Sequence, residues 1–229
     1  MVEKDYNRIS SISNIDEDLW EDIRNGVRSL CLNFNGEYWR KLDRDRLYPE
    51  DFVKSLTEAG YLSCLIPEKY GGSGLPLEAA CVILEEIQRS GGNGAACHAQ
   101  MYMMGTVLRH GSAEQKQKFL PGIASGELRL QAFGVTEPNT GSDTTRLRTL
   151  AVRDGDQYVV NGQKIWTSRA EYSDLLLLLA RTTPLEETQS RRDGLSVFLV
   201  DMRTVEGLEI RPIRTMINHA TTELFFTDM

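Results

Sequence analysis

A chain of 229 residues is long enough to bury a substantial hydrophobic core, as one large domain or as two modest ones. Its formal net charge of -7 argues against nucleic acid as a ligand, because binding to phosphates requires a basic surface. The longest aliphatic run, Leu175 to Ala180, is far shorter than the ~20 residues that a membrane-spanning helix needs. The N-terminal sequence MVEKDYNRISSIS has no apolar segment, so we expect neither a secretory signal nor a transit peptide, and a cytoplasmic protein.

The cysteines and histidines do not form a metal-binding pattern. The four cysteines are far apart and include no CxxC pair: Cys31, Cys64, Cys81 and Cys97. We expect reduced, mostly buried thiols and no metal. Among the three histidines, His110 fits a cation at a helix C-terminus and His219 fits a hydrogen-bond donor in a loop.

The first half of the chain predicts helices. Asp16 is a suitable N-cap for a helix to about Leu32, because apolar residues follow it at helical spacing. Four more helices are predicted at Pro49–Gly60, Pro76–Arg89, Ala95–Arg109 and Ser112–Gly126. The helix from Ala95 is nearly apolar on all sides, so we expect it to be the most buried.

The second half of the chain predicts strands. Seven segments fit the pattern: Leu130–Val135, Leu150–Arg153, Gln157–Ile165, Leu175–Arg181, Leu195–Val200, Leu208–Ile213 and Glu223–Thr227. Asp154-Gly155 and Asn161-Gly162 predict turns. We therefore expect an α+β protein, with an all-helical bundle domain over residues 1–128 and an antiparallel β-barrel or sandwich-like domain over residues 129–229. Because the last strand runs almost directly to Met229, we expect the β domain to be truncated at its C-terminal end.

Two segments of the second half suggest a ligand site. FGVTEPNTGSD, from Phe133 to Asp143, leaves a strand and turns through Pro138, where amides, hydroxyls and small residues are available to a ligand. NGQKIWTSR, from Asn161 to Arg169, ends a strand with an indole and neighbouring hydroxyls. Together the two segments can form one wall of a flat pocket that is both polar and aromatic.

These two segments closely resemble the flavin-binding signature of the acyl-CoA dehydrogenase family, and IPEKYGGSGLP and the region Gly111–Leu120 support the likeness. Nearly the whole chain resembles the family's N-terminal helical and middle β domains. The resemblance implies an FAD-dependent oxidoreductase of fatty acid metabolism, which converts an acyl-CoA to a trans-2-enoyl-CoA. A carboxylate takes the α proton, and the β hydrogen leaves as hydride to the flavin. The resemblance also implies an electron-accepting flavoprotein as partner and a homotetramer at full length.

Carried over residue by residue, the resemblance implies a flavin site of Phe133, Val135, Thr136, Gly141, Ser142, Trp166, Thr167 and Ser168. Val135 and Thr136 would donate to the pyrimidine edge of the ring, where negative charge develops in the reduced flavin. Trp166 would pack against the ring, and Ser168, where the family more often has threonine, would place a hydroxyl near the reactive nitrogen. Gly141 would allow close backbone approach.

The resemblance implies a substrate site as well. Ser142 would bond the CoA moiety or the flavin phosphates. His98, Met101 and Tyr102 would line the acyl cavity from the helix that starts at Ala95, although core packing is an equally good interpretation of each.

No catalytic residue is expected in this chain. The carboxylates in the first segment, Glu137 and Asp143, fit loop-holding roles, because carboxylates beside turns commonly bond backbone amides. The family's catalytic glutamate lies in a C-terminal domain beyond Met229, so we expect the isolated chain to be inactive. Two alternatives stay open: a flavin oxidase or monooxygenase on the same scaffold, and a non-catalytic fragment that binds flavin or acyl-CoA.

Overall fold

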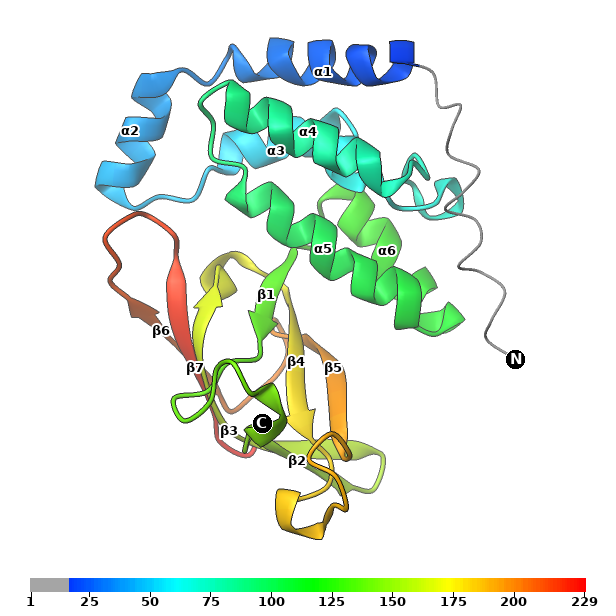
Figure 1. Ribbon diagram of the computed structural model, residues 1–229, viewed down its shortest axis with the longest axis vertical. Helices are drawn as coiled ribbons and strands as arrows, with labels where there is room; N and C mark the ends of the chain where they lie inside the picture. The colour runs from blue at the N-terminus through cyan, green and yellow to red at the C-terminus, as the bar shows by residue number, and fades with distance from the viewer. Residues whose placement is uncertain (1–16) are drawn as a thin grey trace.

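The computed structural model describes residues 17–229, and its first half is helical (Figure 1). The helices are α1 (Glu17–Cys31), α2 (Gly36–Asp45), α3 (Glu50–Glu58), α4 (Leu77–Arg89), α5 (Ala95–His110) and α6 (Ala113–Ser125). Five of them confirm the predicted helices. The predicted N-cap at Asp16 lies outside the described residues.

The helix termini follow the capping signals in the sequence. The hydroxyl of Ser112 accepts a hydrogen bond from the amide of Gln115, whose side chain accepts one from the amide of Ser112 in return. Gly126 ends α6 in the left-handed conformation (φ 82°), which glycine adopts at little cost. These contacts satisfy backbone groups that the helix ends would otherwise leave unpaired.

Helix α2 was not predicted from the sequence. The side chain of Asn35 caps it by accepting hydrogen bonds from the amides of Glu37 and Tyr38. Its short apolar stripe of Tyr38, Trp39 and Leu42 is only partly buried, with Tyr38 and Trp39 packed against the helical core, and the prediction from periodicity did not include this stripe.

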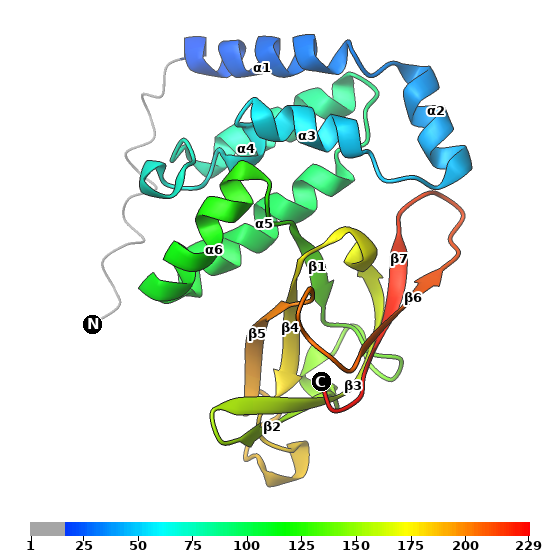
Figure 2. The same cartoon turned by 180° about the vertical axis from the view of Figure 1, so that it is seen from behind.

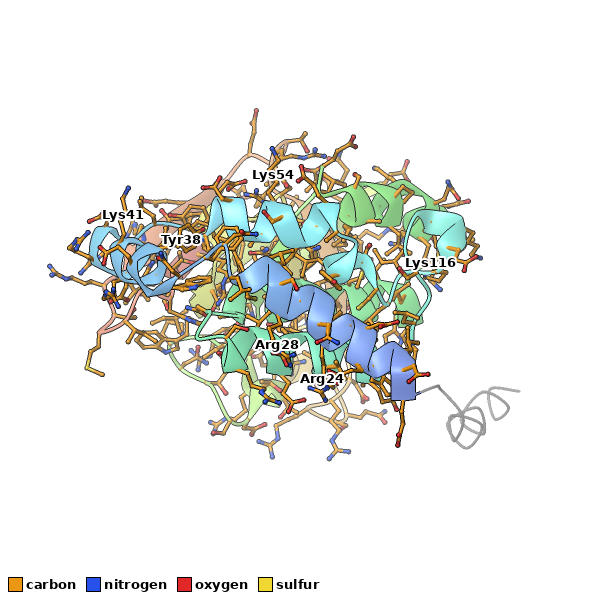
Figure 3. The ribbon with its side chains drawn as sticks, turned by 90° about the horizontal axis from the view of Figure 1, so that it is seen from above. Arg24, Arg28, Tyr38, Lys41, Lys54 and Lys116 are labelled. Carbon is orange, nitrogen blue, oxygen red and sulfur yellow. The ribbon has the colours of Figure 1, made fainter. Side chains whose placement is uncertain are left out.

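Helix α1 lies against α4 through buried contacts and two ion pairs. Arg24 bonds Glu85, and Arg28 bonds Glu86, each at 2.9 Å. Figure 3 shows both arginines on one flank of α1. The Glu86 carboxylate is 2% exposed, so its charge is compensated at the helix interface.

All seven predicted strands are present, and they form one curled sheet below the helices (Figures 1 and 2). They are β1 (Leu130–Gly134), β2 (Leu150–Asp154), β3 (Gln157–Ser168), β4 (Leu175–Arg181), β5 (Leu195–Asp201), β6 (Leu208–Ile213) and β7 (Thr221–Phe226). The strand order is β1-β4-β2-β3-β7-β6, with β5 paired to β4.

The sheet is mixed, although the sequence suggested an antiparallel one. Strands β2–β3, β3–β7, β4–β5 and β6–β7 pair antiparallel. Strand β1 runs parallel to β4, and β2 meets β4 in parallel at a single pair, Leu150 and Arg181. The segment between β1 and β4 contains the whole β2–β3 hairpin, and this long connection permits the parallel pairing.

Asn161-Gly162 was predicted as a turn, and that prediction is wrong. Both residues lie inside β3, where the strand changes partner from β2 to β7. Gly162 has φ 152°, and an added Cβ would lie 2.6 Å from the Oγ1 of Thr149. The glycine therefore permits a close backbone approach at a corner of the sheet. The Asp154-Gly155 turn between β2 and β3 is confirmed.

The helical and β halves share a core. One cluster of buried side chains joins α5 and α6 to Leu130 of β1 and Leu175 of β4. Separate clusters fill the helical half and the sheet. At the edge of the contact, the hydroxyl of Tyr48 and the side-chain amide of Gln131 exchange hydrogen bonds of 2.8 and 3.1 Å. Packing and hydrogen bonds together fix the orientation of the sheet relative to the helices.

The cysteines are free, as predicted. Cys31, Cys64 and Cys97 are buried, and Cys81 is exposed. Burial raises the pKa of Cys64 to about 11 and that of Cys97 to about 12. In residues 17–229 no helix is both long and apolar enough to cross a bilayer.

Candidate functional site

The two segments singled out in the sequence lie side by side. The amide of Ile165 donates a 2.9 Å hydrogen bond to the carbonyl of Thr136. Next to it, the ammonium of Lys164 donates to the carbonyl of Val135 at 3.0 Å and to the carboxylate of Glu137 at 2.9 Å. The loop after β1 is therefore fixed to β3 from both backbone and side chain. We call this group of contacts the Lys164–Glu137 lock.

Glu137 holds the loop, as its predicted structural role requires. Its two carboxylate oxygens accept from the amides of Arg148 (2.6 Å) and Thr149 (2.8 Å). Burial alone would raise the pKa of Glu137, but hydrogen bonds from Thr149, Lys164 and Arg148 outweigh burial and lower it. Burial also lowers the pKa of Lys164, whose bond to Glu137 favours the charged form.

Trp166 lies on the surface in a strained backbone conformation. The pairing of β3 with β7 is interrupted between Lys164 and Thr167, which marks a bulge. Trp166 has φ 63° there, in a region that bulky residues rarely adopt, and it is 57% exposed. Phe133, at the end of β1, is 38% exposed. Strain that presents a large aromatic side chain to the surface is typical of ligand sites.

The remaining predicted ring contacts are less exposed. Val135, Thr136 and Ser168 are half-buried. Thr167 is only 1% exposed, and its hydroxyl has no hydrogen-bond partner among the described residues, while its carbonyl accepts from the hydroxyl of Thr222. The Thr167 side chain thus faces the interior, unlike the exposed indole that precedes it.

Gly141 and Ser142 lie in the exposed part of the loop. A Cβ on Gly141 would come no closer than 3.8 Å to another atom, the Cγ2 of Thr136. The fold itself therefore does not require glycine there, whereas a ligand approaching the backbone would. Asp143 is a loop carboxylate, as predicted, and pairs with Arg191 at 3.1 Å.

The predicted acyl-contact residues divide between the surface and the core. His98 and Tyr102 are exposed on α5, with ring centroids 4.8 Å apart. Met101 is buried in the helical core. Among the described helices α5 has the most buried residues, as expected, although His98 and Tyr102 leave part of one face exposed.

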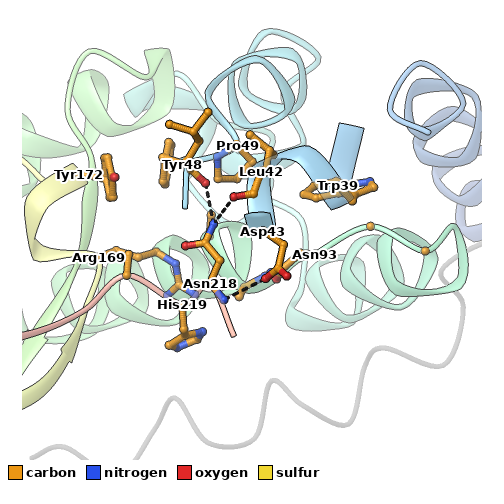
Figure 4. A pocket seen from close by; sticks show the side chains of 16 residues that line it. Trp39, Leu42, Asp43, Tyr48, Pro49, Asn93, Arg169, Tyr172, Asn218 and His219 are labelled. Atoms are coloured by element: carbon orange, nitrogen blue, oxygen red, sulfur yellow. Dashed lines mark hydrogen bonds between the residues drawn. The ribbon is translucent and has the colours of Figure 1, made fainter. Parts of the chain in front are cut away.

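A pocket of about 220 Å³ lies where α2, the start of α5 and the β6–β7 loop meet. The Arg169 side chain enters this interdomain pocket on the side of Asn218 and His219 (Figure 4). Arg169 directly follows Ser168, so the pocket adjoins the end of β3 that carries the aromatic wall. Burial, and then the charge of Arg169, lowers the pKa of His219.

Asn218 closes one side of this pocket. Its side-chain amide donates to the carbonyls of Leu42 (3.0 Å) and Leu47 (2.9 Å), which satisfies backbone acceptors at the C-terminal end of α2. Its backbone amide donates to the carboxylate of Asp43 at 3.0 Å. Figures 1 and 2 show the β6–β7 loop reaching up to α2.

Sequence reasoning missed two important side chains, Arg169 and Lys164. Both lie in the segment Asn161–Arg169, where the interpretation of the sequence relied on the indole and the hydroxyls. The sequence offered no signal for either one, because a charged residue predicts a surface position and only the fold shows that both are buried.

The wall fits a flat aromatic ring with a polar edge, such as a flavin. An exposed, strained indole offers a packing surface, and Ser168 offers a hydroxyl. At Gly141 no side chain closer than 3.8 Å crowds the position of an added Cβ, so the backbone of the loop is open there. Within residues 17–229 there is no group of three or more metal-ligating side chains.

Comparison with known proteins agrees with this geometry. Residues 18–127 match the family model for the acyl-CoA dehydrogenase N-terminal domain, and residues 132–229 match that for the acyl-CoA dehydrogenase middle domain. The two matches cover the helical half and the sheet, respectively.

Similar proteins are roughly twice as long as this chain or longer. The chain is 41% identical to a (2S)-methylsuccinyl-CoA dehydrogenase of Cereibacter sphaeroides, over 89% of this chain and 36% of that protein. It is 32% identical to a glutaryl-CoA dehydrogenase of Desulfococcus multivorans, over 92% of this chain and 54% of that protein.

A solved structure has the same fold. An acyl-CoA dehydrogenase from Geobacillus kaustophilus superimposes with a TM-score of 0.85 at 29% identity, over 94% of this chain and 57% of that one. Matched domain by domain in sequence and in fold, the chain belongs to the acyl-CoA dehydrogenase family, of which it contains the N-terminal and middle domains.

Proposed function

We propose that the chain forms the flavin-facing and acyl-facing parts of an FAD-dependent acyl-CoA dehydrogenase that produces a trans-2-enoyl-CoA. One observation carries the proposal: the Lys164–Glu137 lock joins two segments that present an exposed, strained indole beside backbone donors and hydroxyls. Bound FAD would supply the hydride acceptor.

The residues of the wall would bind and orient the ring. Trp166 would pack against it, and Phe133 would border its approach. The amide of Val135 and the amide and hydroxyl of Thr136 would donate to its pyrimidine edge. Ser168 would donate its hydroxyl near the reacting position. Because the buried lock fixes this geometry before the ligand arrives, the donors need little reorganisation.

Six further residues would complete the ligand site. Gly141 and Ser142 would receive the phosphates or the CoA moiety at the mouth, and the buried Thr167 would support the bulge from inside. His98 and Tyr102 would border the acyl chain from α5. Met101 would shape this wall from the core side, since it is buried.

Proton abstraction requires a base, and we place it in a C-terminal domain of the whole protein rather than among these residues. The isolated chain would then bind ligands without turnover. For the whole protein we propose an acyl-CoA substrate from fatty acid metabolism, an electron-accepting flavoprotein, a homotetramer and a cytoplasmic location. We place the boundary of its first two domains between residues 128 and 129.

The visible spectrum of the purified chain, after addition of FAD and desalting, tests the proposal. We expect retained flavin absorbance that shifts on addition of acyl-CoA, and weaker retention in Trp166→Asn and Ser168→Ala. The control variant Ser196→Ala changes a hydroxyl on β5, outside the wall. Equal retention in all variants, or a folded chain that never retains flavin, would contradict the assigned site.

An oxidase on the same scaffold is the second candidate. One similar solved structure, at 25% identity and a TM-score of 0.84, is the prolyl acyl carrier protein oxidase AnaB. The rate of reoxidation separates the two, since a reduced oxidase would be reoxidised rapidly by air and a dehydrogenase slowly.

A further inference from the structure

The hydroxyl of Thr222 is bonded, inside the sheet, to the backbone of the wall that we propose for the flavin. Thr222 lies in β7 and is 0% exposed. Its hydroxyl donates a 2.8 Å hydrogen bond to the carbonyl of Thr167, which lies between Trp166 and Ser168. The hydroxyl of Thr167 itself is buried without a partner among the described residues. Within residues 17–229, the bond from Thr222 is therefore the only side-chain hydrogen bond to the peptide group that joins Thr167 to Ser168.

This bond fixes the direction in which that peptide group points. The carbonyl of Thr167 points toward β7, because its donor lies there. In a trans peptide the carbonyl and the following amide point to opposite sides, and residues 17–229 contain no cis peptide bond. The amide of Ser168 therefore points away from β7.

The side of β3 that lies opposite β7 faces the loop after β1. The amide of Ile165 leaves β3 on that side and donates to the carbonyl of Thr136 at 2.9 Å. Strand β2 pairs with β3 only from Gln157 to Asn161, so no strand covers β3 at Ser168. The amide of Ser168 has no acceptor among the described residues. It is therefore a free donor at the edge of the proposed wall.

Backbone strain is concentrated around this peptide group. Trp166 has φ 63°, Arg169 has φ 59° and Ala220 has φ 49°. Residues other than glycine adopt such conformations infrequently. The amide of Arg169 donates to the carbonyl of Ala220 at 2.7 Å, which fixes one end of the strained segment to the residue before β7. Because strained backbone persists only where its neighbours hold it, the bond from Thr222 restrains the same segment from inside.

A restraint in the free chain affects binding because an oriented donor needs no ordering when a ligand arrives. The bond between Thr222 and Thr167 lies in the interior of the sheet, where water does not compete for either group. Ser168, in contrast, is half-buried and can reach a ligand. Thr222 is too deeply buried to touch a ligand, so it acts on one only through Ser168.

A purely structural role is the alternative for Thr222. Threonine hydroxyls commonly bond backbone carbonyls, and in α3 the hydroxyl of Thr57 donates to the carbonyl of Val53 at 2.8 Å. The two bonds have the same donor, the same kind of acceptor and the same length. They differ in place, because only the bond from Thr222 lies beside the exposed and strained Trp166. Thr57 therefore provides a matched control.

We propose that Thr222 is a positioning residue for the flavin, which fixes the peptide group between Thr167 and Ser168 so that the donors of Ser168 meet the ring. Its effect on FAD rests on the proposed function. The restraint on the peptide group does not, so the two can be tested separately.

Titration of the chain with FAD, followed by flavin absorbance, tests the effect on binding. Thr222→Val removes the hydroxyl and nearly keeps the shape of the side chain. We expect FAD to bind about three- to tenfold more weakly, as for the loss of one hydrogen bond, and the absorbance bands of bound flavin to shift. Thr222→Ser keeps a hydroxyl and should restore both the affinity and the spectrum. Thr57→Val should lower the urea midpoint and leave FAD binding and the flavin spectrum unchanged.

The amide resonance of Ser168, measured by nuclear magnetic resonance without FAD, tests the restraint itself. We expect this resonance to shift and broaden in Thr222→Val, because the peptide group is no longer held, and to be unchanged in Thr57→Val. If Thr222→Val does not fold, Thr222→Ala compared with Thr222→Ser gives the same test, since alanine and serine differ only in the hydroxyl.

The outcomes separate the role of Thr222 from the proposed function. If the wild type and Thr222→Val bind FAD equally with the same spectrum, the proposed function stands and the role of Thr222 is refuted. An unchanged Ser168 resonance, or equal weakening of FAD binding in Thr57→Val, also overturns that role. If the folded wild type binds no FAD while Thr222→Val shifts the Ser168 resonance, the proposed function fails for this chain and the restraint on the peptide group stands.

Discussion

Replacing Lys164 by methionine should destabilise the β half and loosen the ligand wall. The ammonium is 0% exposed and makes two hydrogen bonds, to the carbonyl of Val135 and to the 2% exposed carboxylate of Glu137. Methionine has a similar length but leaves the carboxylate buried without its counter-charge. Breaking a buried ion pair in this way costs about 3–5 kcal/mol. Weaker FAD retention should accompany this loss of stability, because the carbonyl of Val135 is no longer held by Lys164 and the loop after β1 becomes less fixed.

A double-mutant cycle measures the interaction itself. We expect Lys164→Met and Glu137→Gln each to lower the free energy of unfolding, and the double variant to lower it by less than the sum. The coupling energy should be about 1–3 kcal/mol, as found for residues in one hydrogen-bonded network. Urea unfolding, followed by circular dichroism and tryptophan fluorescence, provides the values. Additive effects, with a coupling energy below about 0.5 kcal/mol, would show that Lys164 and Glu137 do not stabilise each other.

The same pair predicts a pH dependence with a definite sign. Glu137 has a lowered pKa in the folded chain, so its contribution is present above the unfolded pKa of about 4.3 and is lost as the pH falls through the folded value. The stability difference between the wild type and Glu137→Gln should be constant near neutral pH and shrink in acid. As a control, Arg211→Gln at the exposed pair with Glu209 should have no measurable effect on unfolding.

Three further predictions address other features of the fold. Gly162→Ala should lower the free energy of unfolding in urea by about 2–3 kcal/mol, because the new Cβ would clash with Thr149 at a positive φ. An unchanged urea midpoint would contradict the close backbone approach at Gly162. Trp166→Asn should leave stability unchanged or raise it by up to about 1 kcal/mol, since asparagine tolerates this backbone, and a clear loss of stability would contradict the inferred strain. Only Cys81 should react rapidly with a thiol reagent in the folded chain, and fast reaction of a second thiol would show that the cores open readily.

The elements with a strong periodic pattern or a clear cap could be predicted from the sequence. Helix α6 lies between Ser112 and Gly126, the two residues that the sequence predicted as its limits. Every predicted strand is also present. Helix α2 was missed although Asn35 caps it and Tyr38 and Trp39 give it an apolar side, because a helix of 10 residues offers only a short pattern. The parallel pairing of β1 with β4 could not be predicted either, because the alternation of apolar and polar residues in a strand does not show whether its neighbour runs parallel or antiparallel.

The candidate site was predictable where it depends on exposed chemistry and not where it depends on burial. The side chains of Trp166 and Ser168 signal a ligand wall by type and position. By contrast, Lys164 reads as an ordinary surface residue, because only the fold reveals that Glu137 and Val135 surround it. Arg169 is similar, since its burial depends on residues that are distant in the sequence.

The strained backbone at Trp166 and the Lys164–Glu137 lock depend on each other. The bulge in β3 turns the backbone so that Trp166, at φ 63°, presents its indole to the surface. A backbone in this region costs about 1–3 kcal/mol and persists only where its surroundings fix it. Lys164, two residues earlier, supplies that restraint by tying the strand to the loop after β1. If so, Lys164→Met should relax the bulge, and adding Trp166→Asn to it should recover part of the lost stability, since the strain that the lock supports is then removed.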